Sequence, residues 1–369
     1  MLVVNAGSSS LKLRLVDDGT RVLRSCDLDT GSTGIGAEEL DAILRDWPAA
    51  DAVGHRIVHG GTQFMHAVRI DADVERALRD LTTLAPLHQP KSLAAYDAVS
   101  ARLPNVPAVA CFDTAFHAGL PEAAATYAVP REWRERYGVR RFGFHGLNHA
   151  YVSRRAAAML NRPLDTLRIV TCHLGAGASL AAVVNGRSVD TTMGFTPLEG
   201  LVMATRSGSV DPGLVLWLEE HEHLAPREVA NALERRSGLL ALGGSADMRE
   251  IEKRAQAGDA AAKLAFDVFV QRLVTGIGAM AAAAGGLDAL VFTGGIGEHS
   301  PTVRHAACAR LTHLGVRIDE SANTNVREDI DIGLAAAASR VFVIAAREDI
   351  EIDRETRAVL AQPARRTGS

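Results

Sequence analysis

Short apolar runs alternate along the chain with longer segments of helical periodicity, and this alternation predicts an α/β protein. The apolar or alternating runs predict strands at residues 2–5, 11–16, 52–58, 107–111, 168–173, 179–184, 188–192, 289–293 and 340–345. Helices are expected at residues 37–46, 73–83, 91–102, 147–160, 213–221, 226–235, 259–284, 301–313 and 348–360. A length of 369 residues exceeds what one small core usually holds, so two domains are expected.

The chain opens with MLVVNAGSSSLKLRLV, in which an apolar run, a Gly/Ser cluster and an alternating run follow one another. This order predicts a strand, a turn and a second strand. Two interpretations of the turn stay open. It is either an ordinary polar hairpin loop or a loop whose backbone N–H groups and hydroxyls bind a phosphate.

Residues 168–192 repeat this plan and then add Asn185-Gly186, a strong signal for a two-residue hairpin. Two copies of one β-turn-β device predict a duplicated domain whose turns face each other across a cleft. The alternative is coincidence, because Gly-rich hairpins are common.

A third Gly-rich turn is expected at residues 293–300, between an apolar strand and a helix that begins near Pro301. Such a turn suits a nucleotide, although none of the three turns matches the P-loop or the dinucleotide fingerprint.

Composition narrows the class of protein further. A net charge of −4 with scattered Lys and Arg argues against a nucleic-acid surface. The four cysteines lack metal-type spacing and suggest a reducing compartment. No signal peptide opens the sequence, and the most apolar stretch is interrupted by Gly285, Gly286 and Asp288, so a cytoplasmic protein without a membrane span is expected.

Two arginines lie beside glycines that allow close backbone approach: Arg56 in GHRIVHGG and Arg206 in MATRSGSVDPG. A guanidinium binds carboxylate or phosphoryl groups with two parallel hydrogen bonds, so both are candidates for an anionic substrate. The alternative for each is a surface ion pair. Asp113 follows an apolar strand, where α/β folds place ligands, and Glu348 follows the last strand, where it could reach magnesium. The alternative for both carboxylates is a helix cap.

Two histidines four residues apart, His145 and His149, could bind zinc on a helix. The segment lacks the glutamate of H-E-x-x-H, and Gly146 favours a loop position for His145 before the helix. A zinc site is therefore not the favoured interpretation.

The motifs NAGSSSLK, GHRIVHGG, APLHQP, FDTAFH, FGFHGLNH, CHLGAGAS, MGFTPLEGL, TRSGSVDP and FTGGIGEHS occur in this order over nearly the whole chain. Together they resemble the acetate kinases of the acetate and sugar kinase, heat-shock protein and actin superfamily. The resemblance implies two duplicated actin-like (ribonuclease H-like) domains with a nucleotide cleft between them. Residues 1–117 and 350–369 would form one, and residues 118–349 the other, which binds the nucleotide and dimerises.

The resemblance also implies roles for individual residues. The implied catalytic residues are Asp113, Arg206, His145 and Arg56. Arg56 would also bind the acetate carboxylate, in a small apolar pocket made by Val58, Leu87, Phe144 and Pro197 with His88 at its edge. The nucleotide would lie along Lys12, His173, Leu174, Gly175, Ala176, Gly177, Asp247, Met248, Arg249, Gly295, Ile296, Gly297, Glu298 and His299. Asn5 and Glu348 would hold Mg²⁺, with Mn²⁺ as a possible substitute.

The implied activity is reversible, direct in-line phosphoryl transfer from ATP to acetate, in a homodimer. Ala176 and His299 stand where the family usually has Asn, Met248 stands where it has Phe, and AARED replaces Thr-Asn-Glu-Glu. These departures leave another donor, such as pyrophosphate, open. Propionate stays open as acceptor, because one methylene in an apolar pocket discriminates by only about 1–3 kcal/mol. A regulator that binds nucleotide without turnover is the alternative from a different class.

Overall fold

The computed structural model describes residues 1–7, 10–18, 21–29, 37–85 and 89–362. The chain divides into two compact units. Unit 1 comprises residues 1–118, 146–151 and 347–369, and unit 2 comprises residues 119–145 and 152–346. The boundary therefore crosses helix α6 (Gly146–Leu160).

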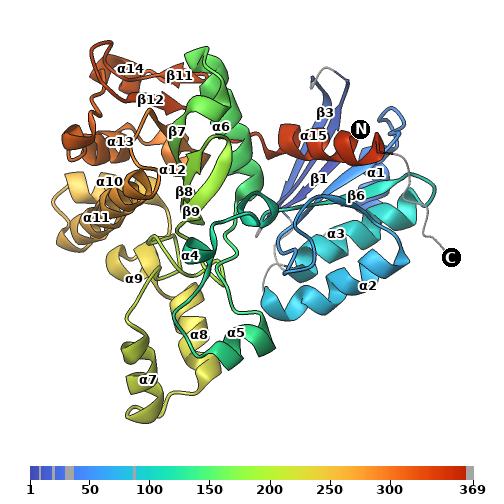
Figure 1. Cartoon of the computed structure of the whole chain (residues 1–369), viewed down its shortest axis with the longest axis horizontal. Coiled ribbons are helices and arrows are strands. Elements are labelled where there is room, and N and C mark those ends of the chain that lie inside the picture. The colour runs from blue at the N-terminus through green and yellow to red at the C-terminus, as the bar shows by residue number, and fades with distance from the viewer. Residues whose placement is uncertain (8–9, 19–20, 30–36, 86–88, 363–369) are drawn as a thin grey trace. The chain divides into compact units, whose positions relative to one another are not determined.

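Unit 1 is built on a six-stranded mixed sheet (Figure 1). Its strands are β1 (Leu2–Ala6), β2 (Ser10–Val16), β3 (Val22–Asp29), β4 (Val53–Ile57), β5 (Val68–Arg69) and β6 (Ala108–Phe112), in the order β3-β2-β1-β4-β6-β5. Its helices are α1 (Ala37–Leu44), α2 (Ala72–Asp80), α3 (Gln89–Arg102) and α15 (Glu348–Leu360). The central strands β1, β4 and β6 are parallel, and β2, β3 and β5 pair antiparallel to their neighbours.

Helices cover both faces of this sheet, which explains why β1 is buried along its whole length and carries consecutive apolar residues at Leu2, Val3 and Val4 rather than alternating. Helix α3 packs against β1 and β4, and α15 packs against β1, β4 and β6. On the α15 face, a Cβ at Gly54 would overlap Thr356 and Ile352, so glycine is needed for this close packing.

Unit 2 repeats the plan with the sheet order β9-β8-β7-β10-β12-β11. Its strands are β7 (Arg168–Leu174), β8 (Ala178–Val184), β9 (Arg187–Thr191), β10 (Ala289–Thr293), β11 (Ile330–Asp331) and β12 (Arg340–Val343). Its helices are α4 (Glu122–Ala125), α5 (Arg131–Tyr137), α7 (Pro212–Glu220), α8 (Pro226–Arg235), α9 (Gly238–Gly243), α10 (Met248–Gln256), α11 (Ala260–Ala283), α12 (Gly294–His299), α13 (Pro301–Cys308) and α14 (Glu320–Thr324). Each strand of unit 1 thus has a counterpart of equal place and direction, which confirms the predicted duplication.

Helix α11 is the long helix of unit 2 and packs on β7 and β8. Asp259 caps its start by accepting the N–H groups of Ala261 and Ala262, and the positive φ angles of Gly285 and Gly286 follow its end. By length and apolar content α11 could cross a bilayer, but core helices of soluble proteins pass the same test, so this is weak evidence for a membrane span.

Several sequence predictions need correction. The stretch 293–300 is not a turn: β10 runs directly into α12, where Glu298 Oε1 accepts the first N–H, of Gly294, at 2.8 Å. Its three glycines have low helix propensity, which hid this helix. The helix expected at 301–313 ends at Cys308, and a separate 3₁₀ turn follows at Thr312–Leu314. The edge strands β3, β5 and β11 and the helices α4, α5, α9, α10 and α14 were not predicted.

Buried His55 makes the stability of the protein depend on pH. Its ring is 1% exposed in β4, stacks edge-on against Tyr96, and neither ring nitrogen has a hydrogen-bond partner within the described part of the chain. Burial lowers the pKa of His55 to about 3, and burial also lowers the pKa of His59 to about 4. Unfolding raises both values towards about 6.5.

The contribution of these two histidines to the free energy of unfolding should therefore be fully present above pH 6.5. It should be lost as the pH drops below that value, because the unfolded chain then binds protons that the folded chain excludes. His55 alone should contribute about 1.4 kcal/mol per pH unit over that window. His55→Leu should flatten the dependence partly, since His59 remains, whereas His313→Gln at an exposed position should not. Denaturant titrations between pH 7.5 and 4.5 measure this, and equal slopes in His55→Leu and the unmodified protein would contradict it.

Candidate active site

In unit 1 the ends of three parallel strands bring together an arginine, a carboxylate and an amide. Asn5 lies in β1, Arg56 in β4, and Asp113 directly after β6. Arg56 donates Nη2 to Asp113 Oδ2 at 2.6 Å and Nε to Oδ1 at 3.0 Å, and its Nη1 lies 3.2 Å from Asn5 Oδ1. Asn5 Nδ2 in turn donates to Glu348 Oε2 at 2.6 Å, at the first turn of α15. Ligands of α/β folds bind at this edge of a sheet.

The Arg56–Asp113 pair is not a surface ion pair, because the two side chains are 13% and 2% exposed. Burial alone lowers the pKa of Arg56, but the charges of Asp113 and Glu348 outweigh this effect and raise it overall. Asp113 does not cap the following 3₁₀ turn at Ala115–His117: Thr114 stands at the cap position, without a side-chain cap bond. The group therefore keeps a permanent cation fixed between anionic and polar neighbours.

In unit 2 a histidine and an arginine surround Gly177, between β7 and β8. A Cβ built on Gly177 would lie 3.3 Å from His145 Nε2 and 3.7 Å from Arg206 Nη1. His145 directly precedes α6, as predicted, with a left-handed φ of 57°. Its Nδ1 lies 2.9 Å from Ser179 Oγ, and its ring stacks on His173 at 4.2 Å. These contacts leave Nε2 on the Gly177 side, so the sequence motif CHLGAGAS fixes the orientation of the ring.

Arg206 reaches the same place from the irregular segment before α7. Its Nη1 donates to the Pro197 carbonyl at 2.9 Å and lies 3.5 Å from the Met203 sulfur. Burial lowers the pKa of Arg206, and the charge of Glu234 offsets only part of that effect. A desolvated guanidinium held by a carbonyl and a thioether is suited to bind an anionic group.

The predicted nucleotide segments take defined backbone conformations in unit 2. Gly175 N–H donates to the Gly177 carbonyl, and the Ala176 carbonyl accepts Ala204 N–H, so the loop after β7 is tied to the segment that carries Arg206. Gly294, at φ +77°, lies against the Leu174 backbone, and a Cβ there would overlap it. The end of β7 and the start of α12 therefore lie side by side, which brings together the predicted residues Leu174, Gly175, Gly295, Ile296 and Gly297.

Other predicted nucleotide residues have local structural partners. Asp247 caps α10 by accepting Arg249 N–H and pairs with the Arg249 guanidinium, while Met248 is buried. Glu298 Oε1 accepts the N–H groups of Gly294 and Ala346. His299 is exposed, with Nδ1 3.1 Å from the Gly295 carbonyl.

The remaining predicted residues belong to both units. In unit 1, Lys12 is exposed on β2 opposite Asn5 and Val58 is 8% exposed after β4; in unit 2, Phe144 is buried and Pro197 is partly exposed. Leu87, His88, Ser8 and Ser9 lie outside the described residues. His149 stacks edge-on against His117, whereas His145 contacts His173, and the described residues contain no metal-binding cluster of three or more His, Cys, Asp or Glu.

Sequence reasoning missed polar residues that support these groups. Gln89 in APLHQP binds the His59 backbone on both sides, accepting its N–H at 3.2 Å and donating to its carbonyl at 3.3 Å. Tyr127, Arg141 and Glu199 bond to one another around the MGFTPLEGL segment. The signal available was proximity to a motif, because Gln89 and Glu199 lie inside motifs and Arg141 precedes FGFHGLNH.

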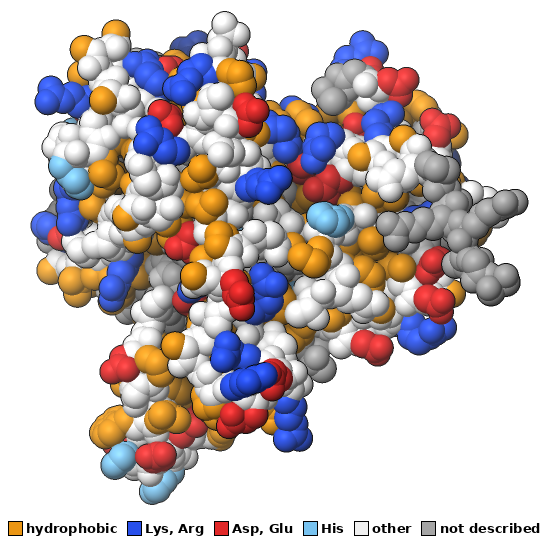
Figure 2. Space-filling view, in the orientation of Figure 1, with side chains coloured by type: hydrophobic (Ala, Val, Ile, Leu, Met, Phe, Trp, Pro, Cys, Tyr) orange, Lys and Arg blue, Asp and Glu red, His pale blue; other side chains and the backbone are white. Residues whose placement is uncertain are grey.

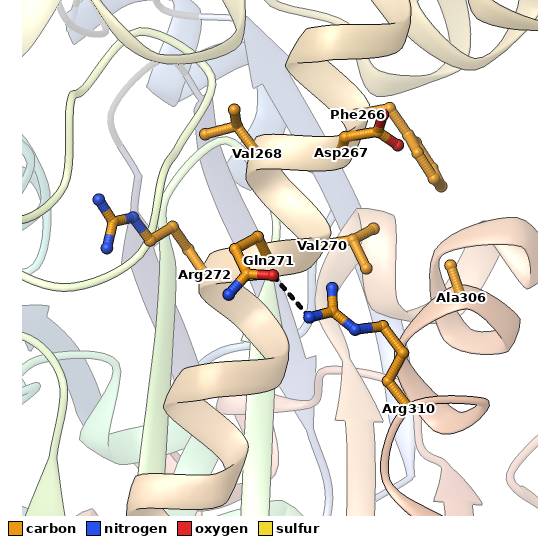
Figure 3. A pocket seen from close by; sticks show the side chains of 8 residues that line it. All are labelled: Phe266, Asp267, Val268, Val270, Gln271, Arg272, Ala306 and Arg310. Atoms are coloured by element: carbon orange, nitrogen blue, oxygen red, sulfur yellow. Dashed lines mark hydrogen bonds between the residues drawn. The ribbon is translucent and has the colours of Figure 1, made fainter.

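A groove of about 630 Å³ between α11 and α13 lies apart from the predicted residues, none of which lines it. Figure 3 shows Gln271 and Arg310 pointing toward each other there, and Arg310 Nη2 donates to Gln271 Oε1 at 2.5 Å. This groove is therefore not the candidate active site.

Comparisons with known proteins agree with the duplicated fold and the motif set. The sequence profile of the acetokinase family matches residues 35–354. An acetate kinase of Dictyoglomus thermophilum is 40% identical over 390 aligned residues, which cover 96% of this chain and 98% of the relative. Crystal structures of an acetate kinase from Porphyromonas gingivalis and of a propionate kinase from Francisella tularensis both superpose with a TM-score of 0.88, at 36% and 35% identity; each covers 97% of this chain and 99% of the other.

These likenesses define an enzyme of the actin-like kinase class, a phosphotransferase whose acceptor is a carboxyl group. The chain belongs to the acetokinase family.

Proposed function

We propose that the protein transfers the γ-phosphoryl group of ATP reversibly to acetate, giving acetyl phosphate and ADP. The observation that carries the proposal is the meeting of His145 Nε2 and Arg206 Nη1 around Gly177, next to the loop after β7. A guanidinium and an imidazole fixed at one point can neutralise the charge that in-line transfer places on the equatorial phosphoryl oxygens, provided that the imidazole donates from Nε2.

Acetate is already a carboxylate at neutral pH, so its attacking oxygen has no proton to lose and the reaction needs no general base. Asp113 is bonded to Arg56, which agrees with this requirement. We assign Arg56 to the acetate carboxylate, Arg206 and His145 to the phosphoryl group, and Asp113 to the orientation of Arg56. Val58 would narrow the acceptor pocket and favours acetate over propionate.

Magnesium would neutralise charge on the phosphates when bound. The carboxylate of Glu348 suits this hard cation. Asn5 Oδ1 accepts from Arg56 and its Nδ2 donates to Glu348, so in this geometry Asn5 orients the carboxylate. We therefore infer that Glu348 would hold the metal, with Asn5 positioning it.

The donor is the less constrained half of the proposal, because Ala176 and His299 replace asparagines that are usual in the family. The Ala176 carbonyl is engaged by Ala204 N–H and His299 Nδ1 by the Gly295 carbonyl. These contacts fix the backbone at both positions, and the assay below decides between ATP and another donor.

The experiment is acetyl hydroxamate formation by the purified protein with magnesium, using acetate or propionate and ATP, GTP or pyrophosphate. Fast turnover with ATP and acetate is expected. Turnover only with pyrophosphate would show that pyrophosphate, not ATP, is the donor. Faster turnover with propionate than with acetate would make propionate the acceptor. Nucleotide binding without any turnover would support the alternative that the protein is a nucleotide-binding regulator.

We further propose a cytoplasmic homodimer formed through unit 2. The residues around α7 that are 38–56% exposed include Val210, Leu214, Leu216 and Trp217. Figure 2 shows hydrophobic side chains gathered over this end of unit 2. Sedimentation velocity of the unmodified protein and of Trp217→Glu tests this proposal. The unmodified protein should sediment as a dimer, and the glutamate charge on this apolar surface should shift Trp217→Glu towards the monomer.

A further inference from the structure

A compact polar cluster in unit 2 lies beside the segment 192–200 and outside the predicted site residues. It consists of Tyr127 before α5, Arg141 after it, and Glu199. Arg141 Nη2 binds Glu199 Oε1 at 2.8 Å, and the Tyr127 hydroxyl donates to Glu199 Oε2. The Arg141 guanidinium also lies over the Tyr127 ring at 5.5 Å.

This cluster holds the segment 192–200 at both of its ends. Arg141 Nη1 donates to the carbonyls of residues 191, 192 and 193 at 3.1–3.2 Å. The Tyr127 hydroxyl accepts Phe195 N–H at 3.0 Å. A Cβ at Gly194 would overlap both Glu199 and Tyr127, so the backbone passes directly against the cluster.

The same segment contacts Arg206 directly and also contacts the chain two residues before His145. The Pro197 carbonyl accepts Arg206 Nη1 at 2.9 Å. The Gly194 carbonyl accepts the N–H groups of Phe142 and Gly143 at 3.0 and 3.3 Å, immediately before His145 in the chain. A displacement of this one segment would therefore move Arg206 and His145 together.

We propose that Tyr127, Arg141 and Glu199 are positioning residues that fix the segment 192–200 and, through it, the locations of Arg206 and His145. This inference rests on the proposed function of those two residues. The cluster acts through backbone contacts, so it affects the rate rather than nucleotide binding. A misplacement of about 1 Å in such groups can cost on the order of 10²-fold in rate.

Glu199→Gln keeps the shape of the side chain but weakens its bonds to Arg141 and Tyr127. It is expected to lower kcat by about 10- to 100-fold while the KM for ATP stays unchanged. Tyr127→Phe removes the hydroxyl that joins Glu199 to Phe195 and should act in the same direction. The matched control is Asp331→Asn, which breaks the ion pair between Asp331 and Arg340, also in unit 2. The two pairs are similarly buried: the side chains of Arg340 and Asp331 are 26% and 30% exposed, and those of Arg141 and Glu199 are 17% and 34% exposed.

A double-mutant cycle with Arg206→Lys separates positioning from a general loss of stability. If Glu199 acts through Arg206, Glu199→Gln should cost much less kcat in the Arg206→Lys background than alone. Equal kcat losses in both backgrounds, or a drop in melting temperature like that of Asp331→Asn with kcat unchanged, would overturn the inference.

A crystal structure of Glu199→Gln decides the inference independently of turnover. The Arg206 Nη1 to Pro197 carbonyl contact is expected to lengthen from 2.9 Å, and an unchanged contact would overturn the positioning role. An active parent protein whose kcat is unaffected by Arg206→Lys would instead count against the proposed function of Arg206.

Discussion

Arg206→Ala is expected to lower kcat by about 10³-fold or more and to leave nucleotide affinity and melting temperature nearly unchanged. The rate falls because the variant lacks the cation beside Gly177 that would neutralise the transferring group. Stability is retained because the described hydrogen bonds of the guanidinium go to a backbone carbonyl and a thioether. Burial also disfavours the charged form of Arg206, lowering its pKa, so its removal relieves a desolvation cost.

The measurement combines steady-state kinetics with calorimetric titration of ATP. Arg206→Lys keeps the charge without the planar fork and should recover only part of the rate. Arg131→Ala is the matched control, since that arginine of unit 2 is 79% exposed and pairs with Glu135 on the surface. Unchanged turnover in Arg206→Ala would remove this arginine from the mechanism.

The strands of both sheets were largely predictable because their buried positions form apolar runs. The exceptions lie at sheet edges: β5 and β11 have two residues each, and β3 reads VLRSCDLD with polar residues on both faces. Short edge strands take their conformation from one neighbour, so their own sequence carries little signal. Helix α12 was not predicted because three of its six residues are glycines, which have low helix propensity.

The residues assigned to chemistry each stand in a local sequence motif: Arg56 and Asp113 at strand ends, His145 before α6 and Arg206 in an irregular segment. The cluster that supports them was not predictable, because its bonds join residues far apart in sequence: Tyr127 and Glu199 are separated by 72 positions, and Arg141 and Glu199 by 58. A single sequence does not reveal such pairs. Likewise, the mutual orientation of Asn5, Arg56 and Asp113 depends on the register of three strands.

Arg56→Ala is expected to lose both activity and stability, which distinguishes it from Arg206→Ala. Its kcat should fall by about 10³-fold or more, because the acetate carboxylate loses its cation. The free energy of unfolding should also fall by about 3–5 kcal/mol, since the buried Asp113 carboxylate loses the guanidinium that neutralises it. Asn5 would lose its contact with the same guanidinium, which should loosen its hold on Glu348.

The double variant Arg56→Ala/Asp113→Asn tests this explanation. Removing the buried negative charge as well should restore most of the lost stability while leaving turnover low, because the destabilisation comes from an uncompensated charge and the rate loss from the missing cation. Denaturant titration and hydroxamate assays on the two single variants and the double variant measure the two effects separately. If Arg56→Ala is as stable as the unmodified protein, the ion pair with Arg56 does not stabilise the buried Asp113 carboxylate. If the double variant regains turnover, Arg56 does not bind the acceptor.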